Sequence, residues 1–265
     1  MGTRLTVVGG GKMGEALVAG LLGAGWGEAA EIAVVEKVEA RRLELADRFP
    51  GLVVVADVRA ADGAVVAVKP DDVEAACRAL AASGTPVVLS IAAGIALSSL
   101  EGWLGDGVRV VRAMPNTPAL VGAGAAAIAG GATATDDDMA WAEALLSAVG
   151  TVVRVPERLL DAVTGLSGSG PAYVFLVAEA LIDAGVLAGL PRATSSALVV
   201  QTLLGSARLL AESGDGPEAL RAAVTSPGGT TAAGLQVLED RAVRGALIAA
   251  VQAATERSRQ LGGGG

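Results

Sequence analysis

The feature that most constrains the fold of this chain is a glycine-rich turn close to its N-terminus. The short apolar run Leu5–Val8 leads directly into Gly9-Gly10-Gly11-Lys12-Met13-Gly14, and apolar residues then recur at helical spacing over Glu15–Leu22. The spacing Gly-x-Gly-x-x-Gly between a strand and a helix predicts a dinucleotide-binding turn. The first glycine permits the tight turn, the second lets a pyrophosphate approach the backbone, and the third allows the helix to pack on the strand. A glycine-rich turn without a ligand is the alternative.

The rest of the first half alternates between apolar strands and helices. Its strands are rich in β-branched residues and lack polar alternation, which is typical of a parallel sheet covered by helices on both faces. Ligands of such sheets bind at the carboxyl ends of the strands. Further strands are predicted over Ile32–Val35, Leu52–Ala56, Ala64–Val68, Val87–Ile91, Val108–Arg112, Gly124–Ile128 and Thr151–Val155, and helices over Val73–Ala82 and Asp136–Ala148.

An acidic residue, Glu36, follows the second strand. A carboxylate about 20 residues beyond the glycines is expected to accept hydrogen bonds from the ribose hydroxyls of NAD. The same charge repels the 2′-phosphate of NADP, whereas Lys37, Arg41 and Arg42 are placed to hold one. The alternative is that these three cations simply form a solvated helix face. The sequence therefore leaves the choice of cofactor open at this point.

Three further segments fall at the ends of strands. The small residues Ala92, Ala93 and Gly94 leave room for a flat nicotinamide ring, Asn116 is placed to hydrogen-bond its carboxamide, and Lys69 is placed to face cofactor or substrate. Each segment alone is typical of an ordinary turn. Together, at one edge of a sheet that begins with a dinucleotide turn, they favour a cofactor site. The segments are Val68-Lys69-Pro70, Ser90-Ile91-Ala92-Ala93-Gly94 and Met114-Pro115-Asn116-Thr117-Pro118.

The second half of the chain has no strand signal. We place the domain boundary near residue 156, so that residues 1–156 form a dinucleotide-binding domain and residues 157–265 form an all-helical one. The run Ala193–Ala207 carries no charge. A helix that is apolar all round must be buried, and a domain of about 100 residues buries few helices completely. This predicts oligomerisation through the helical half, unless the run is one central helix within the domain. Helices are predicted over Arg158–Val163, Ala172–Ala184, Ala193–Ser213, Pro217–Val224, Thr231–Leu238 and Val243–Gln260.

Two glycine-containing segments interrupt these helices. In Val224-Thr225-Ser226-Pro227-Gly228-Gly229-Thr230-Thr231, the Pro-Gly-Gly run stops a helix and the two threonine hydroxyls are expected to cap the next one. A helix N-terminus exposed in this way favours a small anion such as a carboxylate. The second segment, Leu166–Tyr173, is predicted as a glycine–serine turn before another helix. Both are also compatible with ordinary interhelical loops.

Composition excludes several classes of function. The net charge of −8 argues against nucleic acid or an anionic membrane as a partner. Pro, Gly and polar residues break the two long uncharged stretches, Ala79–Leu100 and Ala113–Thr135, so we expect no membrane span there. The single cysteine, Cys77, permits no internal disulfide and suits the cytoplasm. Because the chain contains no histidine, the usual catalytic base and metal ligand is missing, and no metal site is predicted.

These motifs together resemble the pyrroline-5-carboxylate reductases, and the resemblance extends over nearly the whole chain. The resemblance implies a Rossmann-type α/β domain followed by an all-α domain that dimerises by interlocking helices, with dimers often assembling further into rings. It also implies the reduction of 1-pyrroline-5-carboxylate to L-proline, the last step of proline biosynthesis, normally with NADPH, while NADH stays plausible. The matching segments are Gly9–Gly14, Ala67–Pro70, Ser90–Gly94, Arg112–Pro118, Asp161–Tyr173 and Ser226–Thr231.

The resemblance also implies site residues. A cyclic imine is already electrophilic once protonated, so hydride transfer needs positioning more than acid catalysis, which fits a chain without histidine. Thr231 is the candidate catalytic residue, placed to hydrogen-bond the ring nitrogen. The substrate carboxylate is expected at Ser226, Gly228, Gly229, Thr230 and Thr231. The cofactor is expected at Gly9, Gly11, Lys12, Met13, Gly14, Glu36, Lys37, Val68, Lys69, Pro70, Ala92, Ala93, Gly94 and Asn116.

The sequence departs from the family in two places. Many members have Gly-Gly-Phe-Arg where this chain has Asp240-Arg241-Ala242-Val243-Arg244, which bears on local helix packing. Glu36 sits less comfortably with a strict NADPH preference. Two rival functions fit the sequence less well. A β-hydroxyacid dehydrogenase uses a lysine of its helical domain, but Lys12, Lys37 and Lys69 all lie in the first half. A catalytically idle dinucleotide sensor would not need the intact substrate loop.

Overall fold

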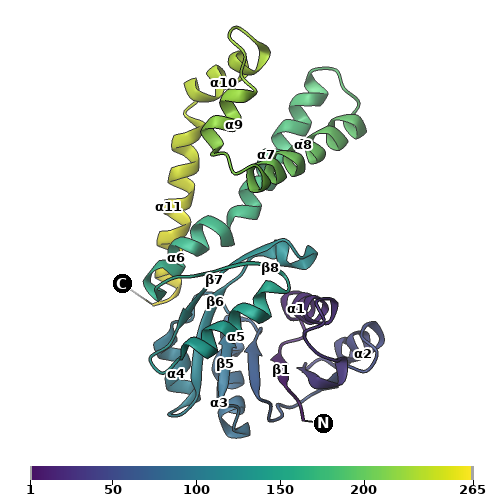
Figure 1. Cartoon of the computed structure of the whole chain (residues 1–265), viewed down its shortest axis with the longest axis vertical. Helices are drawn as coiled ribbons and strands as arrows, with labels where there is room; N and C mark the ends of the chain where they lie inside the picture. Colours follow the sequence, from purple (N-terminus) through teal and green to yellow (C-terminus); the bar gives the residue numbers. More distant parts are fainter. Residues whose placement is uncertain (1, 264–265) are drawn as a thin grey trace. The chain divides into compact units, whose positions relative to one another are not determined.

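The computed structural model describes residues 2–263, which form two compact units. The first unit extends to Ser169 and also includes the chain from Gln252 onward, and the second is Gly170–Val251. The first unit is an α/β structure built on one sheet, and the second contains helices and their connections (Figure 1). The fold class predicted from the sequence is confirmed.

One eight-stranded sheet organises the first unit, in the order β3-β2-β1-β4-β5-β6-β7-β8 (Figure 1). The five strand pairs from β3 to β6 are parallel, as the apolar β-branched runs predict. The strands are β1 Leu5–Val8, β2 Ile32–Val35, β3 Val53–Val55, β4 Gly63–Val66, β5 Val87–Ser90, β6 Arg109–Met114, β7 Gly124–Gly130 and β8 Gly150–Arg154.

The last two strands of the sheet run in the opposite direction to the others. Strand β7 pairs antiparallel with β6, and β8 pairs parallel with β7. The connection between β6 and β7 contains only the 3-10 helix η3, Thr117–Val121. A parallel return needs a crossover of a dozen or more residues, so this short connection can only reverse the chain.

Helices cover both faces of the sheet, as the sequence predicts. Alternate residues of a strand point to opposite faces, so Leu5 and Val7 enter one buried cluster and Val8 enters the other. The first cluster takes side chains from α1 Lys12–Gly23, α2 Glu39–Arg48 and α5 Asp136–Ser147. The second takes side chains from α3 Val73–Ser83, α4 Leu97–Leu104 and α6 Leu160–Val163.

The strands end in register at one edge of the sheet. Val8, the last residue of β1, lies opposite Val35 of β2 and Val66 of β4, and Val66 lies opposite Ser90 of β5. The segments that follow these strands therefore begin side by side. This edge is where the sequence predicts the cofactor, and the register is what brings its separate segments together.

The segment predicted as a glycine–serine turn, Leu166–Tyr173, is not a turn. The chain passes from α6 through a π-helix, Thr164–Gly168, into α7, Gly170–Leu187. The Ser169 N–H donates to the Thr164 carbonyl at 2.8 Å, the five-residue bond of a π-helix. The Thr164 and Ser167 hydroxyls donate to carbonyls four residues earlier, at 2.9 and 3.1 Å. Side chains thus hold helical backbone where composition alone indicates a loop.

The first compact unit extends past residue 156, where the sequence analysis places the domain boundary. Leu160 is fully buried in the second core cluster, which ties α6 to the sheet. The end of α11, Val243–Leu261, returns to the same unit, where the Ser258 hydroxyl donates to Asp161 Oδ1 at 2.7 Å. The compact units therefore divide at Ser169 and Gln252 because these helical turns pack with the sheet.

The second unit has no apolar core of its own. Besides α7 and most of α11 it contains α8 Arg192–Glu212, α9 Pro217–Ala223 and α10 Thr230–Asp240. Within residues 170–251 the one buried side chain is polar, that of Ser195, whose hydroxyl donates to the Ile182 carbonyl at 2.8 Å where α7 and α8 meet. Phe175 and Leu187 are 66% and 91% exposed. Helices this apolar and this exposed need another surface to cover them.

The turn between α10 and α11 has an unusual backbone at Ala242. Its φ is +54°, in the left-handed region, and it alone has a positive φ among the described residues other than glycine. The Ala242 N–H donates to the Glu239 carbonyl at 2.9 Å, and Arg244 Nε donates to Glu239 Oε1 at 2.7 Å. A Cβ in this conformation costs about 1–2 kcal/mol.

We expect Ala242→Gly to leave the free energy of unfolding unchanged or to raise it by about 1 kcal/mol. The relief of left-handed strain is partly offset by the greater freedom of glycine in the unfolded chain, which costs about 0.5–1 kcal/mol. The matched control is Ala253→Gly, the same change at an exposed position inside α11, which should lower stability by about 1 kcal/mol. Urea unfolding of both variants measures the difference. Equal destabilisation of the two variants would contradict the assignment of left-handed backbone strain to Ala242.

Candidate functional site

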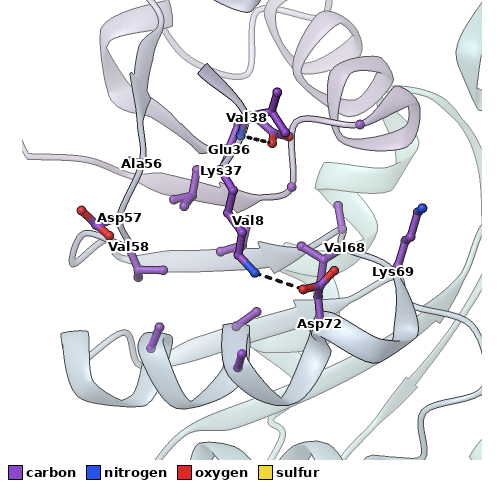
Figure 2. A pocket seen from close by; sticks show the side chains of 17 residues that line it. Val8, Glu36, Lys37, Val38, Ala56, Asp57, Val58, Val68, Lys69 and Asp72 are labelled. Carbon is purple, nitrogen blue, oxygen red and sulfur yellow. Dashed lines mark hydrogen bonds and ion pairs between the residues drawn. The ribbon is translucent and has the colours of Figure 1, made fainter. Parts of the chain in front are cut away.

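A cavity of about 490 Å³ opens at the carboxyl ends of the strands around β1 (Figure 2). Its walls come from the ends of β1, β2 and β4, the loop after β3, and one face of α3. Of the predicted cofactor residues it brings together Gly9, Gly11, Glu36, Lys37, Val68 and Lys69. The other lining residues are Val8, Val35, Val38, Ala56, Asp57, Val58, Ala67, Asp72, Ala75, Ala76 and Ala79.

The three glycines of the turn each meet a different steric demand. Gly9 has a φ of +112°, and a Cβ there would lie 2.6 Å from the Ala67 carbonyl oxygen. A Cβ on Gly14 would collide with the carbonyl oxygen of Gly9, so this glycine lets α1 pack closely on the turn. A Cβ on Gly11 would meet no atom within 4 Å. No neighbouring atom of the chain excludes a side chain at Gly11, so its open side fits a space for a ligand.

The start of α1 faces this space with its backbone N–H groups. Gly11 is the N-cap residue, with φ −67° and ψ −177°, and no described side chain caps the helix. The unpaired N–H groups and the helix dipole make such an end attractive to a phosphate. The open side of Gly11 and the uncapped helix together fit the pyrophosphate of a dinucleotide. Lys12 and Met13 form the first helical turn and do not line the cavity itself.

Two side chains form hydrogen bonds with the backbone of Gly10, one with its N–H and one with its carbonyl. Glu36 Oε2 accepts from the Gly10 N–H at 3.1 Å, and Arg41 Nε donates to the Gly10 carbonyl at 2.8 Å. The second Glu36 oxygen accepts from the Val38 N–H at 2.9 Å (Figure 2). Glu36 thus stands at the ribose position that the sequence predicts, but it also shapes the glycine turn.

The cations that follow β2 do not act alike. Arg41 pairs with Glu44 at 2.9 Å and with Glu15, and these carboxylates raise the pKa of Arg41 above its ordinary value. Arg42 Nη1 donates to the carbonyls of Glu36 and Lys37, at 3.0 and 2.8 Å. The sequence left two alternatives for these arginines, a free phosphate ligand or a solvated helix face, and neither describes them. Both donate hydrogen bonds to backbone carbonyls.

Lys37 extends from the end of β2 toward the start of α3, where its ammonium group lies 3.0 Å from Asp72 Oδ1 (Figure 2). Lys69 also lines the cavity, directly before the 3-10 helix η2, Pro70–Asp72. Pro70 begins that helix and does not line the cavity. The charged side chains on the cavity wall are therefore those of Glu36, Lys37, Asp57, Lys69 and Asp72.

The predicted nicotinamide segment lies outside this cavity. Ala92, Ala93 and Gly94 follow β5, and Gly94 makes the turn with a φ of +76°. The Ala92 N–H donates to the Ser90 hydroxyl at 3.4 Å. A Cβ on Gly94 would lie 4.0 Å from Leu261 Cβ, so the end of α11 borders this loop.

Asn116 has a structural task that the sequence analysis missed. Its Oδ1 accepts from the Ala125 N–H at 2.8 Å, and its Nδ2 donates to the Ser167 carbonyl at 3.0 Å. Four residues beyond Ser167 stands Pro171, which has no N–H to offer that carbonyl. Asn116 supplies the missing donor. The side chain predicted to bind nicotinamide carboxamide is thus engaged within the fold.

The substrate loop predicted from the sequence lies in the second unit. Its α10 begins at Thr230, but the N-cap residue is Gly229 and no described side chain caps it, so the predicted capping by the Thr230 and Thr231 hydroxyls is wrong. The Gly229 N–H donates to the Ser226 carbonyl at 3.0 Å, in the turn directly before the helix. Both threonine side chains are exposed in the first helical turn. Gly228 has a φ of +69°, which only a residue without Cβ adopts freely.

Comparison with known proteins decides the family. A family model described as pyrroline-5-carboxylate reductase dimerisation matches residues 157–261, and one described as NADP oxidoreductase, coenzyme F420-dependent, matches residues 4–94. A pyrroline-5-carboxylate reductase of Synechocystis is 47% identical over 99% of both chains. One of Arabidopsis thaliana is 42% identical over 96% of this chain and 94% of that protein. The chain belongs to the pyrroline-5-carboxylate reductase family.

Solved structures agree with this assignment. A pyrroline-5-carboxylate reductase from Coxiella burnetii superposes with a TM-score of 0.92 at 38% identity, covering 98% of each chain. The Plasmodium falciparum pyrroline carboxylate reductase with NADP bound gives 0.86 at 31% identity, also covering 98% of each. The family reduces 1-pyrroline-5-carboxylate to proline with NAD(P)H, the last step of proline biosynthesis. The enzyme class expected from the sequence is confirmed.

Several residues that line the cavity were not predicted from the sequence. The face of α3 presents Ala75, Ala76 and Ala79, which are small and so leave the cavity open. Asp57 and Val58 follow β3, a strand end that carries no glycine or proline to mark it. The available signal was the parallel order of the strands, since every strand end near β1 borders the same edge.

We expect Gly11→Ala to fold normally and to bind dinucleotides at least about tenfold more weakly. Its new methyl group meets no protein atom within 4 Å and enters the space in front of α1. A tenfold loss corresponds to about 1.4 kcal/mol. Thermal unfolding and fluorescence titration with NADH test the two halves of this expectation.

Gly14→Ala is the matched control, because its methyl group collides with the Gly9 carbonyl oxygen. It should lose about 1–3 kcal/mol of stability through overpacking. Unchanged NADH binding by a well-folded Gly11→Ala would show that the open side of Gly11 is not a ligand space.

Proposed function

We propose that this chain reduces 1-pyrroline-5-carboxylate to L-proline with NADPH or NADH. The observation that carries the proposal is the glycine turn. Atoms of the chain itself leave no room for a Cβ at Gly9 or Gly14, whereas Gly11 borders open space that fits a ligand. The membership of the family supports the substrate. The reaction is tested by following oxidation of NADH and NADPH with and without 1-pyrroline-5-carboxylate.

The residues of the first unit would bind and orient the cofactor, which supplies a hydride when bound. The N–H groups at the start of α1 hold the pyrophosphate, and Glu36 and Lys37 face the ribose. We propose that Lys12, Met13, Gly14, Val68, Lys69 and Pro70 border the bound dinucleotide. The loop Ala92–Gly94 gives the nicotinamide a surface of small residues. For Asn116 we retain a place beside the cofactor, although its carboxamide is largely engaged with Ala125 and Ser167.

The loop of the second unit would bind the substrate. Backbone N–H groups over Gly228–Thr231, at the uncapped start of α10, hold the carboxylate, with Ser226 beside them. The exposed Thr231 hydroxyl hydrogen-bonds the ring nitrogen and so orients the imine carbon toward the hydride donor. Orientation of the reactants accounts for the rate because the protonated imine is already electrophilic.

We infer that selectivity for NADPH is weaker here than is usual in the family. Glu36 stands at the ribose position, and both of its oxygens accept backbone N–H groups. Arg41 and Arg42 are held by other groups. NADPH remains the expected cofactor and NADH a plausible second one. The Plasmodium falciparum relative was solved with NADP bound.

We propose that the protein is a homodimer formed through residues 157–265, with larger rings as a further possibility for its dimers. The dimerisation model of the family matches this region, which is why we keep residue 156 as the functional boundary. The helical run Glu157–Leu187 is long and apolar enough to cross a membrane by length and composition alone. A second copy covering it fits the family better than a bilayer does. With a net charge of −8, we expect a cytoplasmic protein that binds neither membranes nor nucleic acid.

Leu198→Glu should abolish the dimer. Leu198 lies on α8 and is 55% exposed in the single chain, so burial of its exposed part by a second copy contributes about 1–1.5 kcal/mol in each chain, which a carboxylate removes. The matched control is Leu43→Glu, since Leu43 is 66% exposed on α2 of the first unit and the change should leave the assembly intact. Light scattering after size exclusion measures both. A Leu198→Glu protein of unchanged mass and unfolding temperature would refute the proposed interface.

Thr231→Ala should lower kcat without weakening dinucleotide binding. A hydrogen bond to a charged group is worth about 1.5–3 kcal/mol, or about 10- to 150-fold in rate. Because neither threonine caps α10, the variant should keep its stability. Thr230→Ala, one position earlier in the same exposed turn, is the control and should keep its turnover. Normal kcat for both variants would leave the loop as a carboxylate site without a catalytic hydroxyl.

A further inference from the structure

The wall of the cavity holds an ion pair whose partners come from different elements. Lys37 follows β2, and Asp72 belongs to η2 directly before α3. Their charged atoms lie 3.0 Å apart, and both residues line the cavity (Figure 2). Asp72 is not among the residues that the glycine-turn motif predicts. Its position beside the cavity follows from the place of α3 against β4 and β1.

Of the three cations Lys37, Arg41 and Arg42, Lys37 is the one whose charged end pairs with neither the glycine turn nor backbone carbonyls. Arg41 is committed to Gly10, Glu15 and Glu44, and Arg42 to two carbonyls. A 2′-phosphate next to Glu36 would therefore pair with the ammonium group of Lys37. In the structure, Lys37 already pairs with Asp72.

We propose that Asp72 determines cofactor specificity by competing with the 2′-phosphate of NADPH for Lys37. The inference rests on the proposed function, since it assumes that the cavity holds the adenosine half of the cofactor. NADH has a hydroxyl at this position and makes no demand on Lys37. Asp72 therefore lowers affinity for NADPH selectively.

The geometry indicates a weak competitor. The side chains of Lys37 and Asp72 are 76% and 49% exposed, and ion pairs this exposed contribute little. Lys37 can exchange one anion for another at small cost. Removing the Asp72 charge should therefore tighten the binding of a 2′-phosphate by about two- to fivefold, rather than by orders of magnitude.

Two adenosine fragments isolate the effect. Adenosine 2′,5′-bisphosphate and adenosine 5′-monophosphate differ by the 2′-phosphate alone, and calorimetric titration gives their dissociation constants without any turnover. For Asp72→Asn we expect the bisphosphate to bind two- to fivefold more tightly and the monophosphate to bind unchanged. In the Lys37→Met background, Asp72→Asn should change neither constant. The KM ratio of NADPH to NADH should fall by the same factor as the bisphosphate constant.

The control variant is Asp71→Asn, which removes the same charge one residue earlier in η2, where the side chain is exposed and does not line the cavity. An equal gain from Asp71→Asn, or a gain that persists without Lys37, would show a general charge effect and overturn the inference. So would an unchanged bisphosphate constant, while the proposed function would stand. If the unaltered protein binds neither fragment, the cavity is not the adenosine site and the inference falls, whereas turnover of 1-pyrroline-5-carboxylate with NADPH or NADH tests the proposed function separately.

Discussion

The structure depends on a close approach of backbone to backbone where β1 meets α1. At Gly9 and Gly14 the chain passes so near the Ala67 and Gly9 carbonyl groups that no Cβ fits. That approach sets the angle at which α1 lies on the sheet, and with it the direction of the helix N-terminus. Glu36 and Arg41 then hold the intervening Gly10 by its N–H and its carbonyl. Packing and hydrogen bonds within the chain thus fix the N-terminal end of α1 without any ligand.

Much of the first unit could be predicted from the sequence because its signals are local. Ile32–Val35 is a strand with the bounds that its apolar run indicates. The glycine spacing predicted a turn, and in the structure a Cβ at Gly9 or Gly14 would collide with the chain, as that prediction requires. The reversal of β7 was not predicted, because strand direction depends on the length of a connection and the run Gly124–Ile128 reads the same either way. Asp72 was missed since only the fold brings α3 to the cavity.

Several sequence interpretations were incomplete for one physical reason, which is that a side chain serves the partner it reaches in space. Asn116 was assigned to the cofactor, and the structure adds another task, because Pro171 removes a donor from the helix and leaves a carbonyl that Asn116 satisfies. Arg41 and Arg42 were interpreted by their charge, yet both donate to backbone carbonyls. The segment Thr164–Gly168 was taken for a loop by its glycines, but hydroxyl groups and a five-residue hydrogen bond keep it helical. No sequence pattern reports such partners.

The near absence of buried side chains in residues 170–251 has a consequence for how stability should be defined for this chain. A unit whose apolar side chains are covered by another molecule gains its folding free energy from a bimolecular encounter. Its midpoint of denaturation then moves with protein concentration by mass action, whereas a self-sufficient sheet domain keeps the same midpoint at every dilution. The denaturation midpoint of the helical unit would therefore depend on protein concentration, and that of the sheet unit would not. At high dilution the helical unit would unfold while the sheet unit stays folded.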